Sequence, residues 1–599
     1  MSTLDGLTTS TVHLLGGGCI ERVFGPPGTG KSTRLTEMIK EYVLELGPDA
    51  ILATSFTVTA ARSLAAMGLP LPDHQVGTLH SMAYRAVGNF LDVALEPKIL
   101  NDWNTRAIGG WYLTPDARRG HPDAEGSEAA GGGDSGDKLL AAYDLARSQL
   151  MGPQDMPDAV RKFGAAWEGW KKEVEAVDFT DMIFIALQRA IDGEPAPGSP
   201  KILIADEAQD MTPLEIALVL AWGAHPSVTR TIFALDDDQA IMNWRGGNCE
   251  PILALGTGID GGPQLGVELI DTQLAQSWRI PASVHAVAQT FIENCSYRRE
   301  KDYRPRNVDG QIYHVDVTLN DPATARQIAK DVAAGREVMV LASCEYMLRT
   351  VTKNLRELGV PFANRYRPLE NRWNPLRSAT GLTAAERLYR YLVADDRALG
   401  GWTEDGGRAR LWTGDDVRAW SHLLSVKAAG MVRGATAVVK HLPAGTLDVA
   451  QVEGLFTGLS DDDLDRALGP DLTWYMNAAL PSKVETLRYP EKIVRGFGPS
   501  ALVDPPLCTV GTIHSVKGGQ AGRAAKDGNP AVAGVVYLSP ELSPAAAAEW
   551  TLGGRARDNV IRQMYVGLTR TYTSCVILKP ASKYAVPRAT LCPIEMQVK

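Results

Sequence analysis

The stretch GPPGTGKS, residues 25–32, is the part of the chain that decides the fold. Apolar residues between positions 20 and 24 precede it, as in a short strand, and a helix-like apolar pattern follows it. Glycines in such a turn let backbone N–H groups surround phosphate oxygens, and the N-terminus of the following helix adds positive potential. Lys31 would then reach the β- and γ-phosphates of a nucleotide, and the Ser32 hydroxyl would bind Mg²⁺. The spacing predicts a nucleotide site rather than a chance glycine-rich turn.

Length and composition describe an ordinary globular chain with room for several domains. The chain has 599 residues, of which 45% are hydrophobic and 22% charged. No apolar stretch approaches the roughly 20 residues needed to cross a bilayer, and the N-terminus has no basic region followed by an apolar core. We therefore expect no membrane partner and no secretion.

The seven cysteines never form a C-x-x-C pair, which argues against a zinc or iron–sulfur site and favours a reducing compartment. We expect the cytoplasm of a bacterium or of the host of a phage. The net charge of −9 excludes a generally basic protein, but it leaves room for an internal groove that binds nucleic acid.

A second stretch, ILIADEAQD at residues 202–210, ends an apolar run with acids. This pattern is typical of a buried parallel strand that delivers carboxylates at its C-terminal end, where open α/β sheets bind nucleotides. Asp206 would hold Mg²⁺ through water, and Glu207 would orient and deprotonate the attacking water. Adjacent acids after a strand are often only solvated, so the prediction depends on the phosphate loop upstream.

A third stretch, FALDDDQAIMNWRGG at residues 233–247, again ends an apolar run with acids. Gln239 could sense whether a γ-phosphate is present. Trp244 and Arg245 offer a stacking face for a base and a cation for a backbone phosphate. An isolated pair of this kind is more often a core aromatic beside a solvated charge, and that alternative stays open here.

Together these stretches resemble motifs of the UvrD/Rep-type helicases of superfamily 1, the 3′-to-5′ branch. Further stretches that resemble family motifs follow the same order: SFTVTAA (55–61), GTLHS (77–81), LAQSWR (274–279), GTIHSVKG (511–518) and RQMYVGLTR (562–570). The resemblance implies an α/β fold with two RecA-like parallel-sheet motor domains, each interrupted by a mostly helical insertion. It also implies ATP and Mg²⁺ as cofactors.

The resemblance assigns roles to individual residues. Arg279 and Arg570 would reach the γ-phosphate, and Trp278 would stack on adenine. The residues expected to act in catalysis are Lys31, Glu207, Gln239, Arg279 and Arg570, and the metal ligands are Ser32 and Asp206. The residues expected to bind ATP are Gly25, Pro26, Pro27, Gly28, Thr29, Gly30, Lys31, Ser32, Thr33, Trp278 and Gln520. The residues expected to contact DNA are Phe56, Thr57, Thr78, His80, Trp244, Arg245 and His514. For Phe56 and His514 the alternative of ordinary core residues stays open.

The chain departs from the family pattern in three places. Residues 1–24 lack the glutamine that reads the adenine edge, which leaves the strictness of ATP selection open. Met242 stands where the family has a tyrosine, and Gln520 stands where it has a glutamate near the ribose. A Gly/Ala-rich run at residues 518–534 then precedes an apolar strand, and we predict that this run is a flexible insertion.

The positions of the motifs predict the domain organisation. The first motor domain is expected at residues 1–90 and 178–275, with an insertion at 91–177. The second is expected at residues 276–372 and 496–599, with a reduced insertion at 373–495. Within the first insertion, the low-complexity residues 124–138 are expected to be disordered.

The resulting functional prediction is an ATP-dependent 3′-to-5′ DNA helicase or translocase in replication, repair or recombination. Its partners would be single-stranded DNA and junctions of single- and double-stranded DNA, together with an unidentified loading protein. Two alternatives stay open: a translocase that displaces proteins with little unwinding, and a nucleotide-gated DNA-binding scaffold without turnover. RNA also stays open as the strand, because no residue that reads a 2′-hydroxyl is identifiable.

Overall fold

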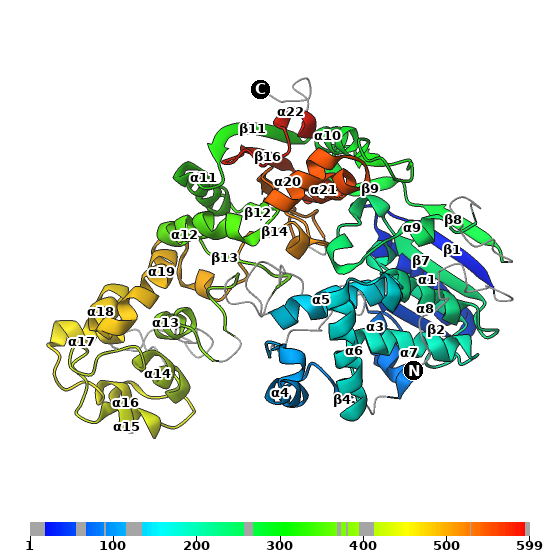
Figure 1. The fold of residues 1–599 in the computed structure, drawn as a ribbon. Coiled ribbons are helices and arrows are strands. Elements are labelled where there is room, and N and C mark those ends of the chain that lie inside the picture. Colours follow the sequence, from blue (N-terminus) through cyan, green and yellow to red (C-terminus); the bar gives the residue numbers. More distant parts are fainter. Residues whose placement is uncertain are drawn as a thin grey trace. The chain divides into compact units, whose positions relative to one another are not determined.

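The computed structural model describes residues 18–55, 68–88, 92–115, 135–256, 267–367, 373–378, 381–393, 412–526 and 529–592 (Figure 1). The chain divides into two compact units, which we describe separately. Unit 1 comprises residues 1–311, 544–569 and 586–597, and unit 2 comprises residues 312–543, 570–585 and 598–599. Within the described ranges, no helix is both long enough and apolar enough to span a membrane.

Unit 1 is built on a six-stranded sheet in the order β3-β2-β6-β7-β1-β8, in which each neighbouring pair is parallel. The strands are β1 (Cys19–Phe24), β2 (Ile51–Ser55), β3 (Val76–Thr78), β6 (Ile202–Asp206), β7 (Arg230–Leu235) and β8 (Leu269–Gln273). Strands β2, β6 and β7 are buried on both faces, which explains their largely apolar sequences, whereas β1 also buries the charged side chains of Glu21 and Arg22. Because the strands are parallel, the ends of β1, β6 and β7 bring the phosphate loop and both acidic stretches to one edge.

Helices cover both faces of this sheet. Successive strand residues point to opposite faces, so Val23 packs with Leu35 of α1 in one core whereas Phe24 packs in the other core. The second core is filled by three further helices, one of which, α8, is buried along nearly all of its length. The helices are α1 (Lys31–Leu46), α3 (Leu79–Val87), α7 (Phe179–Ile191) and α8 (Pro213–Gly223).

Between α3 and α7 lies a mostly helical segment with its own aromatic core. Its elements are β4 (Asp92–Val93), α4 (Pro97–Arg106), α5 (Ser135–Ser148), α6 (Asp158–Glu173) and β5 (Ala176–Val177). In the core, Trp103, Phe163, Trp167 and Trp170 pack with ring centroids between 4.9 and 6.2 Å apart. Edge-to-face contacts dominate, as the charge distribution of aromatic rings favours.

Residues 135–138 begin α5, so the prediction of disorder was wrong for the end of the low-complexity stretch. The side chain of Asp137 accepts hydrogen bonds from the backbone N–H and the hydroxyl of Thr114, at 3.0 and 2.7 Å. These bonds tie the first turn of the helix to the chain before it. The rest of that stretch, residues 124–134, lies outside the described residues.

A buried ion cluster joins this helical segment to α7. Arg147 lies 2.6 Å from Asp178 and 2.7 Å from Asp181, and Lys171 also contacts both carboxylates. Asp178 and Asp181 form the capping box at the start of α7 as well. Burial alone would raise the pKa of Asp178, but Arg147 and Lys171 hold that pKa well below its usual value. The same carboxylate therefore caps a helix and pairs with two buried cations.

Asp178→Asn is expected to lower the free energy of unfolding by about 3–5 kcal/mol, because it removes one charge from a buried ion cluster. Urea unfolding followed by tryptophan fluorescence measures this, since the indole of Trp167 donates to Asp178 at 2.9 Å. The exposed Asp158→Asn in α6 is the control and should change stability by less than about 1 kcal/mol. An equally small loss for Asp178→Asn would contradict the buried character of the cluster.

The short helix α9 before β8, the chain after β8 and three C-terminal helices complete unit 1. Strand β9 pairs in parallel with β10, and α21 packs against α10. The elements are α9 (Glu250–Leu253), β9 (Gln276–Pro281), α10 (Ala282–Ile292), β10 (Arg304–Arg306), α20 (Pro544–Leu552), α21 (Gly554–Leu568) and α22 (Arg588–Leu591).

Unit 2 contains a second six-stranded sheet, in the order β11-β16-β15-β12-β14-β13. The pairs β12–β14, β12–β15, β13–β14 and β15–β16 are parallel, so the predicted α/β class with two parallel sheets is confirmed. The strands are β11 (Gln311–Thr318), β12 (Glu337–Ala342), β13 (Phe362–Ala363), β14 (Cys508–Thr512), β15 (Gly534–Leu538) and β16 (Ser574–Lys579).

Helices α11 (Pro322–Ala333) and α12 (Arg349–Leu358) flank β12 along the chain, and a helical segment with its own core follows β13. Its helices are α13 (Ala384–Leu392), α14 (Gly414–Ser421), α15 (Ala435–Lys440), α16 (Val449–Glu453), α17 (Asp461–Leu468), α18 (Leu472–Ala478) and α19 (Pro481–Phe497). Tyr391 lies at the centre of this core, where its ring packs with those of Trp412, Trp420 and Tyr475.

The Gly/Ala-rich run at residues 518–534 turns back on itself. Arg523 and Val532 exchange both backbone hydrogen bonds, at 3.0 and 2.9 Å. A Cβ on Gly534 would lie 1.8 Å from the carbonyl oxygen of Ala521, so the small residues allow two chain segments to approach closely. The prediction of a flexible insertion was therefore wrong for the described part of this run.

Candidate nucleotide-binding site

The phosphate loop connects β1 to α1 in unit 1. Gly28 and Gly30 have φ values of +75° and +83°, which glycine adopts without steric cost. Thr29 closes the turn, because its N–H and hydroxyl both donate to the carbonyl of Pro26, at 3.2 and 2.8 Å. Lys31 is the first residue of α1, so the unpaired N–H groups of the first helical turn adjoin the loop. Such a turn is suited to bind an anion.

Strand β9 lies directly against this loop. The N–H of Trp278 donates to the carbonyl of Gly28 at 2.8 Å, and the hydroxyl of Ser277 donates to the carbonyl of Pro27 at 3.0 Å. A Cβ on Gly28 would lie only 2.4 Å from the Cβ of Arg279. The predicted residues Trp278 and Arg279 are therefore brought to the phosphate loop. The indole of Trp278 is 69% exposed, as a surface for stacking on a base requires.

The acids that end β6 face the lysine of the phosphate loop. The Lys31 ammonium lies 2.8 Å from Glu207 and 3.9 Å from Asp206. Burial raises the pKa of Asp206 to about 6, an effect that Lys31 opposes and Glu207 adds to. Burial alone would lower the pKa of Lys31, but the two carboxylates raise it above its usual value. Lys31 is thus a fully charged cation that lies 9% exposed beside two acids.

A chain of hydrogen bonds continues from Glu207 to Gln239. The amide of Gln209 donates to Glu207 at 2.5 Å, and its oxygen accepts from the N–H of Asp236 at 3.1 Å. The carboxylate of Asp236 then accepts from the side-chain amide of Gln239 at 2.6 Å. The sequence assigned no role to Gln209 or Asp236. Their only sequence signal was their position inside the two acidic stretches.

The residues predicted to hold Mg²⁺ fit that ion. Ser32 offers a hydroxyl oxygen at the exposed start of α1, and Asp206 offers a carboxylate oxygen at the end of β6. Hydroxyl, carboxylate and water oxygens are the ligands that Mg²⁺ prefers, and the ion usually keeps several waters. The ammonium of Lys31 already reaches the Asp206 carboxylate, so this acid lies beside the phosphate loop.

The residues of unit 1 that were predicted to contact DNA have different surroundings in the structure. The hydroxyl of Thr78 accepts from the N–H of Ser81 and caps α3, which gives it a structural role. Trp244 is 45% exposed, with the guanidinium of Arg245 5.9 Å from its ring centroid. His80 lies 3.7 Å from Glu215, whose raised pKa results from burial and is partly offset by Arg245. Glu215 thus lies near both His80 and Arg245.

The remaining predicted residues are either outside the described residues or part of unit 2. Phe56 and Thr57 are outside the described residues. In unit 2, Arg570 is 1% exposed and its guanidinium donates to the carbonyl of Gly519 at 3.1 Å. The side chain of Gln520 donates to the carbonyl of Gly522 at 3.0 Å, and His514 opens a short helical turn after β14.

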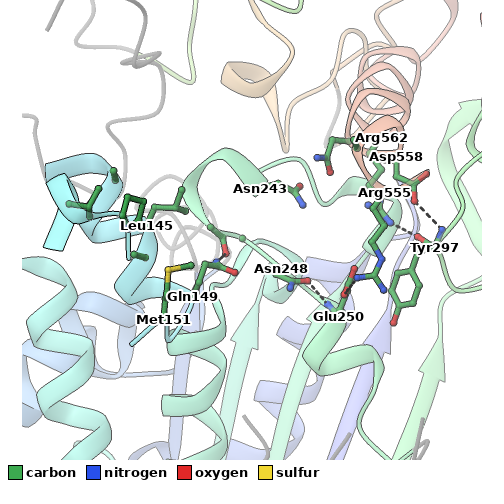
Figure 2. A pocket seen from close by; sticks show the side chains of 18 residues that line it. Leu145, Gln149, Met151, Asn243, Asn248, Glu250, Tyr297, Arg555, Asp558 and Arg562 are labelled. Carbon is green, nitrogen blue, oxygen red and sulfur yellow. Dashed lines mark hydrogen bonds and ion pairs between the residues drawn. The ribbon is translucent and has the colours of Figure 1, made fainter. Parts of the chain in front are cut away.

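A cavity of about 590 Å³ adjoins the stretch that carries Trp244 (Figure 2). Leu145 and Met151 give one wall an apolar surface, whereas Asn243 and residues of α21 line the opposite side. Arg555 of α21 pairs with Glu250 at 2.9 Å across this lining. All residues that line the cavity belong to unit 1, and none of them belongs to the phosphate loop.

The comparisons with known proteins agree with this geometry. A family model described as an AAA domain matches residues 19–245. No curated protein matches the chain. The matched span begins with β1 and ends at Arg245, so it includes the phosphate loop, both acidic stretches and Gln239. AAA domains are P-loop NTPase domains, which typically bind a nucleotide together with Mg²⁺. The match therefore assigns to residues 19–245 a likeness to domains of the P-loop type.

Proposed function

We propose that the protein is an ATP-dependent 3′-to-5′ DNA helicase or translocase that couples ATP hydrolysis to movement along single-stranded DNA. The observation that carries this proposal is the continuous chain from Lys31 through Glu207 and Gln209 to Gln239. It joins the phosphate loop to the stretch in which the exposed Trp244 follows Gln239. The resemblance of the motifs to superfamily 1 supplies the polarity and the choice of DNA.

In the proposed reaction, Lys31 neutralises the β- and γ-phosphates while Glu207 removes a proton from the attacking water. Gln209 holds Glu207 in place through its 2.5 Å hydrogen bond. Arg279, which adjoins Gly28, stabilises charge on the transferred phosphoryl group, and the resemblance adds Arg570 in the same role. A Mg²⁺ ion held by Ser32 and Asp206 would neutralise further phosphate charge.

The link to movement is proposed to begin at Gln239. Its amide is fixed by Asp236, and loss of the γ-phosphate would change the contacts available to it. Trp244 and Arg245 follow in the next short helical turn, where they would stack on a base and neutralise a phosphate. A nucleotide can shift the protein between two conformations only if its contacts differ between them, and in this proposal the contact of Gln239 with the γ-phosphate is the one that differs.

A translocase with little unwinding activity is the second candidate, and Met242 favours it. This residue replaces the family tyrosine and is 1% exposed, so it packs in the core and offers no stacking surface. A strand-displacement assay on a tailed duplex, run beside an assay of protein displacement from a single strand, separates the two candidates.

Single-stranded DNA is expected to stimulate ATP hydrolysis, and Trp244→Ala is expected to weaken DNA binding by about 1–3 kcal/mol, the usual contribution of a stacked base. Fluorescence anisotropy with a labelled oligonucleotide measures the affinity, and steady-state turnover measures the stimulation. Tyr346→Ala removes another exposed aromatic, in unit 2, and should leave both quantities unchanged. Turnover indifferent to DNA in the unsubstituted protein would contradict the proposed function.

A further inference from the structure

Residues 296–303, between α10 and β10, lie outside every stretch that the sequence singled out. The start of the segment contacts α21. Asp558 of that helix accepts hydrogen bonds from the N–H and the hydroxyl of Ser296, both at 2.8 Å, and from the N–H of Tyr297 at 3.0 Å. The segment ends at the phosphate loop, where the hydroxyl of Tyr303 donates to the carbonyl of Pro27 at 2.7 Å. The segment therefore contacts both α21 and the nucleotide site.

The middle of the segment supplies two cations that pair with three consecutive acids at the end of β7. The Lys301 ammonium lies 2.6 Å from Asp237, 2.7 Å from Asp238 and 3.6 Å from Asp236. The side chains of Lys301 and Asp236 are 1% and 0% exposed. Arg298 adds a two-pronged pair with Asp238, at 2.9 Å for each contact. Three acids at this depth need such partners, because buried charge without compensation is strongly unfavourable.

Asp236 links Lys301 to the proposed catalytic residues. One oxygen of its carboxylate faces Lys301, and the other accepts the amide of Gln239 at 2.6 Å. Its backbone N–H donates to Gln209, which in turn donates to Glu207. A displacement of Asp236 would thus move the hydrogen-bond partners of both Gln239 and Gln209.

We propose that Lys301 is a positioning residue for nucleotide hydrolysis, which fixes Asp236 and thereby sets Gln239 to detect the γ-phosphate and Gln209 to hold Glu207. Lys301 acts through these side chains and does not itself touch the nucleotide. The inference rests on the proposed hydrolysis at Lys31 and Glu207 and extends it to a residue far from the motifs in sequence.

The test is Lys301→Met in the full chain, which keeps the length of the side chain and removes its charge. Misplacement of reacting groups by about 1 Å can reduce a rate by about 10²-fold, so we expect kcat for ATP hydrolysis to fall by about that factor. Equilibrium binding of a non-hydrolysable ATP analogue and of ADP gives a second readout. The affinity for the ATP analogue, divided by the affinity for ADP, should fall to the value measured for Gln239→Ala. The affinity for ADP itself should be retained.

Arg304→Ala provides the matched control. Arg304 is a basic residue close to Lys301 in the chain, but its side chain is 65% exposed and pairs with Asp302. Its loss should leave kcat and the affinity ratio unchanged. If Lys301 has only a structural role, folded Lys301→Met retains the kcat and the affinity ratio of the unsubstituted protein, and that result overturns the proposal.

The double variant Lys301→Met/Asp237→Asn settles the case in which the single variant fails to fold. It removes one carboxylate along with the ammonium, so the net charge of the buried cluster equals that of the unsubstituted protein. The contact between Lys301 and Asp236 is still lost. A folded double variant with low kcat and a reduced affinity ratio supports positioning, and one with unsubstituted kcat overturns it. If the unsubstituted protein itself shows no turnover with or without DNA, the proposed function fails first and this inference with it.

Discussion

Glu207→Gln is expected to lower kcat for ATP hydrolysis by about 10²–10⁴-fold while nucleotide binding persists. The substitution keeps the size of the side chain and removes its ability to accept a proton. Lys31 loses its 2.8 Å partner, which leaves the ammonium available to phosphate oxygens, so affinity for ATP should hold or rise. Steady-state phosphate release in the presence of single-stranded DNA measures kcat, and equilibrium binding of a fluorescent ATP analogue measures affinity.

Glu194→Gln is the matched control for this experiment. Glu194 is an exposed acid of the same unit that pairs with Arg189 at 3.7 Å, and its neutralisation should leave turnover unchanged. Turnover retained by Glu207→Gln would show that another group activates the water. Asp206 would then be the next candidate, because burial already raises its pKa to about 6.

The sequence predicted those parts of the site that depend on local pattern. The apolar runs before Asp206 and Asp236 are strands β6 and β7, whose burial on both faces explains why their sequences do not alternate, and the short strand predicted before Gly25 is β1. Since parallel strands end at one edge, the order of the motifs was enough to expect that Lys31 and Glu207 lie close together. The α/β class itself was implied by the resemblance of the motifs to a known family.

The sequence could not predict contacts that depend on tertiary packing alone. Lys301 is one of several charged residues in YRREKDYRPR, and nothing in that run marks it as the residue that enters the core. Its partners lie about 60 positions earlier in the chain and come close only because residues 296–303 pack against the end of β7. Gln209 was visible inside DEAQD, but its role depends on the neighbouring strand β7.

Local rules explain two further features. Thr78, which was predicted to contact DNA, is the N-cap of α3, where its hydroxyl accepts from the backbone N–H three residues further along. The run at 518–534 was expected to be flexible because it is rich in glycine and alanine. Small residues also permit close backbone pairing, and Arg523 and Val532 use that possibility.

Lys31→Ala is expected to reduce ATP hydrolysis by about 10³-fold or more and to weaken binding of ATP. Removing one fixed electrostatic contact to a transition state usually reduces a rate by about 10²–10³-fold, and Lys31 also balances charge before the nucleotide binds. Without its ammonium, Glu207 and the buried Asp206 lose a cation that lies 2.8 and 3.9 Å away. Repulsion between these acids and the triphosphate should then oppose binding, which equilibrium titration with an ATP analogue measures.

Lys40→Ala, an exposed substitution on the same helix, separates this effect from a general loss of positive charge on α1. It should leave turnover and affinity unchanged. Circular dichroism and thermal unfolding of Lys31→Ala show whether the protein stays folded, which we expect because Ala favours the helix and Asp206 can take up a proton. If folded Lys31→Ala still hydrolysed ATP at the unsubstituted rate, the phosphate loop would not be the catalytic site, and Glu207, Gln239 and Lys301 would lose their proposed roles together. Loss of turnover in Lys31→Ala with retention in Lys40→Ala would instead locate hydrolysis at the end of β1, where the roles of all three residues can be tested one at a time.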